Sequence, residues 1–269
     1  MFRLGVSEVV LGQRILTGAA GILLVVLAVW LGGFWLAAFF AFIAVIITYE
    51  IGNMMKVRPS SAESLIALFC TALIVLWPAF ERFWYVLFYS LLLLTVFRRE
   101  AFSFSNAGVL FAAALYSSYA FRTLLNLRTW PSGAGWVLLV FIAIWATDTG
   151  AFFSGRALGG PKLAPDVSPK KTISGAVGGL LAAMLFTVGG GLLMFRSLAG
   201  SWALFAVLGL IVSVAGQAGD LVESALKRQY AVKDSGTILP GHGGALDRFD
   251  SLLLAAPIAY HFIIWVFPH

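Results

Sequence analysis

The sequence has little charge and almost no cysteine. Only 11% of its 269 residues are charged, whereas soluble domains carry about 25%. Hydrophobic residues make up 61% of the chain, which excludes an ordinary soluble domain and indicates a polytopic membrane protein. The single cysteine, Cys70, lies in an apolar run, so no intramolecular disulfide can form and we expect the thiol to be buried.

Several catalytic motifs are also absent. The sequence has no cluster of cysteine and histidine, which argues against a zinc site. The segment GGPKLAP lacks both the spacing and the Lys-Ser/Thr pair of a Walker A motif. No nucleophile elbow is present either, so neither P-loop nor hydrolase chemistry is indicated.

Long apolar runs dominate what is present. We expect nine transmembrane helices, because about 20 apolar residues cross a bilayer and lipid offers no partner to unpaired backbone groups. The predicted spans are residues 15–31, 33–49, 64–80, 83–97, 106–125, 136–153, 173–195, 202–219 and 252–267. The sequence therefore predicts an all-α polytopic integral membrane protein. We expect a transmembrane scaffold over residues 1–130 and a catalytic transmembrane region over 131–269, where the long polar connections lie.

The basic residues support this count of spans. If the connections alternate between two sides, the side of the N-terminus receives every lysine and arginine except Arg82, Arg122, Arg128 and Arg196. Cytoplasmic loops carry such an excess. We therefore expect a cytoplasmic N-terminus and an outside C-terminus. We attribute the net charge of +6 to basic residues at the cytoplasmic boundary of the membrane, and we expect no nucleic-acid partner.

A polar stripe follows the eighth apolar run, in DLVESALKRQYA (220–231). Its members recur at helical spacing: Asp220, Glu223, Ser224, Lys227 and Arg228. An interfacial helix that directs its cations toward lipid headgroups would explain the two basic residues. It would not explain the two acids, since carboxylates at membrane depth are costly and usually functional. We therefore expect the eighth helix to continue as an amphipathic helix with its carboxylates nearer the membrane.

A second polar segment, KDSGTILPGHGGALDRFDS (233–251), precedes the last apolar run. Its Pro-Gly-His-Gly-Gly portion predicts a turn, and glycine there allows close approach to a ligand. Asp247 and Asp250 follow at the expected start of the ninth helix, where an acid is favourable. Capping alone would account for Asp250, but not for His242, the glycines and Lys233 together.

A third polar segment surrounds the connection between the sixth and seventh spans. Asp148 lies inside an otherwise apolar span, and an intramembrane carboxylate is a functional hypothesis by default. Ser168, Lys170, Lys171 and Thr172 directly precede the seventh span, and helix N-termini bind phosphate. A basic anchor at the cytoplasmic boundary, as in the positive-inside rule, is an equal alternative for either lysine taken singly.

These three segments share one kind of chemistry. Several carboxylates that offer only oxygen ligands suit a hard cation such as Mg²⁺. The surrounding lysine and arginine residues suit phosphate groups. The residues therefore predict Mg²⁺-assisted phosphoryl or nucleotidyl transfer in a polar active site on the cytoplasmic side of the membrane.

The order of these residues resembles the phosphatidate cytidylyltransferase family, also called CDP-diacylglycerol synthases. The resemblance runs from Ser224 to Asp250 through S-x-L-K-R, K-D-x-G, L-P-G-H-G-G and D-R-x-D. The segment 148–172 is similar as well. It departs from the family at Lys170, where glycine or asparagine is commoner, and it is followed by Ile173 where tryptophan is common. The first 130 residues match only in their membrane character.

The resemblance implies transfer of a cytidylyl group from CTP to phosphatidate, giving CDP-diacylglycerol and pyrophosphate in phospholipid biosynthesis. It implies Mg²⁺ as cofactor, an all-helical enzyme of the bacterial inner (cell) membrane and, in many members, a homodimer. The family's metal centre at paired aspartates falls on Asp220 and Asp247.

Site residues follow from the pattern and the resemblance together. We expect Asp220 and Asp247 to hold metal, with Glu223, Asp148 and Asp250 as further ligands, and the presence of a second cation is left open. The expected catalytic residues are Lys227, Arg228, Lys233, Asp234, His242 and Arg248. The expected substrate-binding residues are Ser168, Lys170, Lys171, Thr172, Ser224, Gly243 and Gly244.

Two alternatives stay open from sequence. A transporter of a phosphorylated solute would place broken helices and polar groups near the bilayer midplane, commonly in paired repeats. The polar groups here gather at one side and no repeat is visible. A nucleotidyltransferase for a different lipid phosphate is excluded less firmly, because apolar surfaces select the lipid tails.

Overall fold

The structure is a computed structural model that describes residues 6–79, 81–238 and 243–267. Within these residues the chain forms nine α-helices, one short 3₁₀ helix and a two-stranded antiparallel hairpin. The α-helices are α1 (Val6–Leu31), α2 (Gly33–Met54), α3 (Ala62–Leu76), α4 (Glu81–Phe97), α5 (Phe104–Arg128), α6 (Gly133–Leu158), α7 (Ile173–Met194), α8 (Trp202–Gln229) and α9 (Leu246–Val266). The hairpin consists of β1 (Lys162–Ala164) and β2 (Ser168–Thr172), and the 3₁₀ helix η1 covers Arg196–Ser201.

The predicted fold class is confirmed, and each predicted span overlaps one helix, although α3 ends at Leu76, before the predicted end of its span. Six helices of the described chain, α2 and α5 to α9, are long and apolar enough to cross a membrane. Gly18–Leu31, Ala62–Leu76 and Phe83–Phe97 are shorter apolar helical stretches. The helices that carry polar residues run further than their apolar runs, so that α8 continues ten residues past the predicted end of its span, to Gln229.

Local sequence accounts for several helix starts. Ser61, Ser103 and Thr172 precede α3, α5 and α7, and each side-chain oxygen accepts a hydrogen bond from the backbone N–H three residues on. Such caps satisfy one of the N–H groups that a helix start leaves unpaired. Gly32 has a φ of 63°, a conformation that favours glycine, and it separates α1 from α2.

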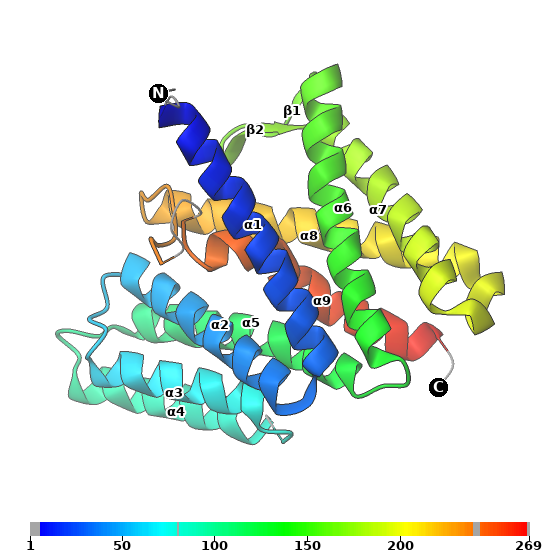
Figure 1. Ribbon diagram of the computed structural model, residues 1–269. Coiled ribbons are helices and arrows are strands. Elements are labelled where there is room, and N and C mark those ends of the chain that lie inside the picture. Colours follow the sequence, from blue (N-terminus) through cyan, green and yellow to red (C-terminus); the bar gives the residue numbers. More distant parts are fainter. Residues whose placement is uncertain (1–5, 80, 239–242, 268–269) are drawn as a thin grey trace, which may run out of the picture.

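The helices form two packed groups, α2 to α5 and α6 to α9, and α1 contacts both α2 and α6. α2, α3, α4 and α5 lie side by side, α6 packs along α7, and α8 packs along α9 (Figure 1). α5 contacts α9 and α1 contacts α6, which joins the two groups. The helix ends alternate between two sides of the molecule. The start of α1, the β-hairpin and the α8–α9 connection lie toward one side, and the α1–α2 and α5–α6 connections lie toward the other (Figure 1).

Small residues bring α6 and α7 into backbone contact. A Cβ atom at Gly175 would lie 2.9 Å from the carbonyl oxygen of Ala151, and one at Gly179 would lie 2.9 Å from that of Thr147. This Gly-x-x-x-Gly spacing is the small-residue pattern that lets membrane helices approach closely. The same contact fixes the end of α6 that carries Asp148.

Buried hydroxyl groups fix the position of α2. Thr48 Oγ1 lies 2.8 Å from Ser117 Oγ of α5 and 3.2 Å from Thr71 Oγ1 of α3. All three side chains are buried. Hydrogen bonds between hydroxyl groups help to hold membrane helices together, because lipid tails are as apolar as the helices and give apolar contacts little selectivity. α2 is therefore anchored two residues before Glu50, which reaches the polar end of the molecule.

Candidate active site

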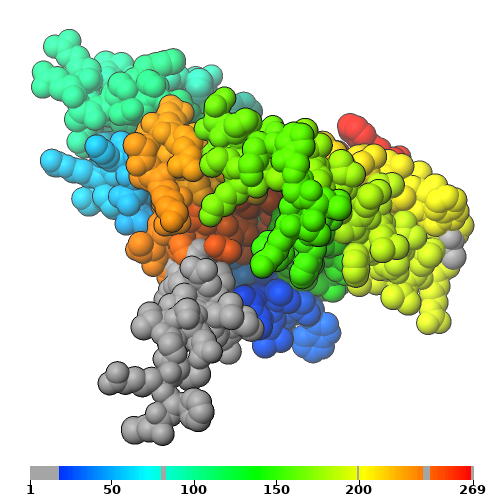
Figure 2. All heavy atoms as spheres, turned by 90° about the horizontal axis from the view of Figure 1, so that it is seen from above, coloured from blue at the N-terminus to red at the C-terminus, as the bar shows by residue number. Residues whose placement is uncertain are grey.

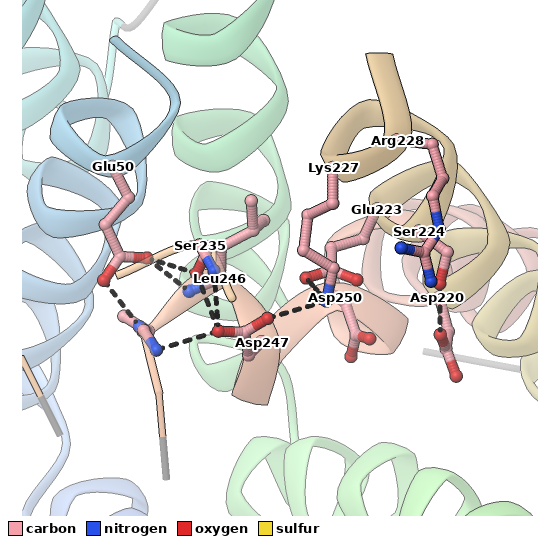
Figure 3. A network of polar contacts seen from close by, with 12 residues as sticks. Glu50, Asp220, Glu223, Ser224, Lys227, Arg228, Ser235, Leu246, Asp247 and Asp250 are labelled. Atoms are coloured by element: carbon pink, nitrogen blue, oxygen red, sulfur yellow. Dashed lines mark hydrogen bonds and ion pairs between the residues drawn. The ribbon is translucent and has the colours of Figure 1, made fainter. Parts of the chain in front are cut away.

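α8 carries the predicted polar stripe on one continuous helix. Lys227 is its central residue, because its Nζ lies 2.7 Å from Glu223 Oε1 and 2.8 Å from Asp247 Oδ1 of α9 (Figure 3). Glu223 is only 3% exposed. An ammonium group shared between two acids from different helices offsets their mutual repulsion, and it joins the stripe to the start of α9.

Three carboxylates gather where α8 meets α9. Asp220, Glu223 and Asp250 each offer an oxygen, and these oxygens all lie within 4.8 Å of one another. The approach is possible because α8 has Gly219 at the contact, where a Cβ would lie 2.6 Å from the carbonyl oxygen of Asp250. Asp148 of α6 lies within electrostatic range of Asp220. This all-oxygen donor set fits a hard divalent cation such as Mg²⁺.

Asp247 has a different environment from these three acids. Its Oδ2 accepts hydrogen bonds from Gly244 N (2.8 Å), Ser235 N (3.0 Å) and Ser235 Oγ (3.0 Å) (Figure 3). Its Oδ1 faces Lys227. Donors of the chain therefore surround the carboxylate, and Asp250, not Asp247, shares the carboxylate cluster with Asp220 and Glu223. The expected Asp220–Asp247 metal pair remains a prediction.

The β-hairpin brings one further cation to the cluster and contacts α8. Lys171 Nζ on β2 lies 2.6 Å from Asp220 Oδ2. Ser224 Oγ donates to Asp220 Oδ1 at 3.4 Å, and Arg228 Nε donates to the carbonyl oxygen of Val167 at 3.4 Å. Thr172 caps α7 through Gly175 N at 3.1 Å, which gives its hydroxyl a structural partner.

The remaining expected site residues that the structure describes lie on β2 and in the α8–α9 connection. Lys170 is exposed on β2 and Ser168 is half-buried, while Lys233 and Asp234 are exposed in the connection between α8 and α9. Gly243 has a φ of 84° and Gly244 is buried. His242 lies outside the described residues. Seen from above, orange-red atoms of α9 lie in a hollow beside the green spheres of α6 and the hairpin (Figure 2).

An apolar cavity opens beside the carboxylates. Its volume is about 470 Å³, within the range of small-molecule sites, and residues of α1, α2, α6 and α9 line it. Most of the lining is apolar, as with Leu24, Ile43 and Ile144. Asp148, Arg248 and Asp250 also line it, and Arg248 is exposed, so one cavity combines an apolar surface with charged groups of the site.

Sequence reasoning missed Glu50 of α2. This carboxylate is 1% exposed, and it accepts hydrogen bonds from Ala245 N and Leu246 N, both at 2.9 Å, and from Ser235 Oγ at 3.0 Å (Figure 3). A signal was available, because Glu50 follows directly on the second apolar run. The expectation that an acid at membrane depth is functional applies to it as it does to Asp148.

Comparisons with known proteins identify the family of the chain. The cytidylyltransferase family matches residues 12–266. The phosphatidate cytidylyltransferase of Bacillus subtilis (strain 168) is 36% identical over 262 residues, which cover 92% of this chain and 96% of that protein. The protein of the same name from Staphylococcus haemolyticus (strain JCSC1435) is 34% identical, over 91% and 96% of the two chains. Its namesake from Brucella suis biovar 1 is 48% identical over 161 residues, 59% of this chain and 58% of that protein. The chain belongs to the cytidylyltransferase family.

Proposed function

We propose that this integral membrane protein is a phosphatidate cytidylyltransferase, which converts CTP and phosphatidate to CDP-diacylglycerol and pyrophosphate. The observation that carries the proposal is the meeting of two surfaces. The cluster of Asp220, Glu223 and Asp250 adjoins the apolar cavity, to which Arg248 and Asp250 both contribute. A lipid phosphate and a nucleotide need such a combination, and the similar proteins carry this name.

The reaction needs little proton transfer. A phosphate oxygen of phosphatidate is already anionic, and it attacks the α-phosphorus of CTP directly. A bond forms between this oxygen and the α-phosphorus, the bond from the α-phosphorus to the bridging oxygen breaks, and pyrophosphate leaves with the electron pair. The difficulty is to bring two polyanions together, so that positioning and charge stabilisation supply the catalysis.

Lysine and arginine side chains supply part of that stabilisation. Lys171 and Lys227 approach the carboxylates from the hairpin and from α8. Arg248 lines the cavity and is exposed, which suits a contact with the phosphate of the lipid. Arg228 and Lys233, both exposed, are proposed to meet the triphosphate. The acyl chains would occupy the apolar part of the cavity.

Mg²⁺ is the proposed cofactor. Asp220, Glu223 and Asp250 would hold it, with Asp148 and Asp247 as nearby carboxylates. Bound Mg²⁺ neutralises charge on phosphate oxygens and orients them. The carboxylates themselves hold Lys171 and Lys227 at the site through ion pairs. The number of cations and the homodimer both remain expectations from the sequence.

The proposed location is the bacterial cell membrane with the site facing the cytoplasm. The hairpin and the α8–α9 connection share one side of the molecule (Figure 1), and most basic residues fall on connections of that side. CTP is a cytoplasmic solute and phosphatidate is a membrane lipid, so a site at this interface reaches both substrates.

An assay of the purified protein tests the function. Cytidine-labelled CTP, phosphatidate and Mg²⁺ are supplied in mixed micelles, and we expect label to enter the lipid phase and pyrophosphate to be released in equal amount. Glu100, an exposed acid between α4 and α5, offers a control, because Glu100→Gln should keep full activity. Absence of label from the lipid with a folded wild-type protein would refute the proposal. Uptake of a phosphorylated solute by vesicles that contain the protein would then favour the transporter.

A further inference from the structure

Glu50 joins the two halves of the chain at the site. It lies in the penultimate turn of α2, and its partners Ser235, Ala245 and Leu246 lie 185 to 196 residues further along the chain. The carboxylate is 1% exposed, yet both of its oxygens are hydrogen-bonded. An acid that is buried so completely is costly unless its contacts are in place, so this geometry is tightly specified.

These contacts fix the first turn of α9. The N-cap residue of α9 is Ala245, which has no polar side chain with which to cap the helix. Glu50 Oε1 accepts from Ala245 N, and Glu50 Oε2 accepts from Leu246 N. A carboxylate at a helix N-terminus pairs with free N–H groups and interacts favourably with the helix dipole. α2 therefore supplies the cap that the sequence before α9 lacks.

Ser235 extends the contact to Asp247. The Ser235 hydroxyl lies 3.0 Å from Glu50 Oε2 and 3.0 Å from Asp247 Oδ2, between the two carboxylates (Figure 3). The other oxygen of Asp247 faces Lys227, which also pairs with Glu223. A continuous series of polar contacts thus runs from α2 to the carboxylate cluster on α8.

Glycine allows the loop to close around Glu50. A Cβ atom at Gly236 would lie 2.6 Å from Glu50 Oε1, and one at Gly244 would lie 2.6 Å from each carboxylate oxygen. Both glycines belong to the segment that resembles the family's motif. Their place here is against the carboxylate, where a larger residue would push α2 and the loop apart.

We propose that Glu50 is a positioning residue, which holds the start of α9 and, through Ser235, sets Asp247 and the attached α9 residues against the carboxylates of α8. The catalytic consequence of this inference rests on the proposed function. The structural consequence does not, because it concerns only the positions of Ser235 and of residues 243–248.

Glu50→Gln is the main test, since glutamine keeps the size and replaces one acceptor oxygen by an NH₂ group that opposes an N–H donor. We expect kcat for cytidylyl transfer to fall about 100-fold, as expected for a displacement of reacting groups by about 1 Å. The KM for CTP should change by less than about threefold, because the loss concerns the transition state. Amide hydrogen exchange over residues 243–248 should accelerate, whereas exchange in α3 and α5 should not.

Two variants separate positioning from general destabilisation. Glu63→Gln is the matched control, because Glu63 of α3 is also a buried glutamate, 3% exposed and paired with Arg98 at 3.6 Å. It should leave kcat and exchange at 243–248 unchanged. In a cycle with Ser235→Ala, the double variant should lose less kcat than the product of the two single losses, because both act on Asp247.

The outcomes are distinct. Unchanged kcat or unchanged exchange in Glu50→Gln would overturn the inference, as would losses that multiply in the Ser235 cycle. If wild-type protein transfers no label, the proposed function fails, and the exchange measurement still decides whether Glu50 holds α9. If the glutamine variant does not fold, Glu50→Asp keeps the charge one methylene shorter. It should then show the same faster exchange and a loss of kcat of about tenfold.

Discussion

Two groups of carboxylates both contact Lys227, and their surroundings differ. Glu50 and Asp247 accept hydrogen bonds from backbone N–H groups and from one serine hydroxyl. Asp220, Glu223 and Asp250 lie together with oxygens within 4.8 Å of one another. Like charges at this distance repel, so the second group gains most from a bound cation. We therefore expect the first group chiefly to hold the backbone in place and the second to bind a ligand.

The comparison shows that two aspartates of one motif have different surroundings. Asp247 and Asp250 are three residues apart and lie on one face of α9. From sequence alone, both aspartates are predicted metal ligands. In the structure one completes a loop through Gly244 and Ser235, and the other faces α8. Residue types in the sequence therefore locate the polar site. The hydrogen-bond donors around each carboxylate, which only the structure shows, distinguish Asp247 from Asp250.

The largest expected effect comes from the second group. Asp250→Asn or Asp220→Asn should lower kcat/KM by at least about 100-fold, because each removes a charge from the proposed Mg²⁺ site. The assay is label transfer from CTP to lipid at saturating Mg²⁺, with Glu100→Gln as the control. Full activity in both folded variants would show that the cluster holds no catalytic metal.

Mg²⁺ binding alone should distinguish the two groups. A ligand at 100 times its Kd stabilises the folded state by about 2.7 kcal/mol, so the melting temperature of wild-type protein should rise with Mg²⁺. The rise should be lost in Asp250→Asn and smaller but still present in Glu50→Gln, because the glutamine variant displaces Asp250 without removing its charge. An equal rise in all three proteins would contradict the division between structural and ligand-binding carboxylates.

Much of this architecture was accessible from sequence. Apolar runs and basic residues located the nine helices, and helical spacing placed Glu223 and Lys227 on one stripe, because both signals are local. The role of Glu50 was not accessible, since it depends on a contact with Leu246 across 196 residues. The proximity of Asp250 to Asp220 could not be predicted from sequence either. It depends on the rotation of α9 against α8, which the close contact at Gly219 sets.

The cavity should give a smaller and more selective effect. Ile144→Trp would fill part of the apolar space that Ile43 and Leu24 also line. We expect the KM for phosphatidate to rise about tenfold, since one or two displaced methylene groups cost about 1–3 kcal/mol, while the KM for CTP stays unchanged. Leu185→Trp on the exposed face of α7 is the matched control. A higher KM for CTP instead would place the lipid elsewhere.

The smallest effect should separate two neighbouring lysines on β2. Lys171 lies 2.6 Å from Asp220, whereas Lys170 is exposed. Lys171→Ala should lower kcat/KM about tenfold. Loss of one hydrogen bond to a charged group costs about 1.5–3 kcal/mol, and Lys171 is partly exposed, so we expect the lower end of this range. Lys170→Ala should change it less than about twofold, as an exposed charge is screened by salt. Measured side by side at 0.15 M salt, equal losses would mean that the hairpin binds phosphate as a whole through its positive charge. A loss confined to Lys171 would mean that alternation along β2 directs one lysine into the carboxylate cluster and the other to solvent.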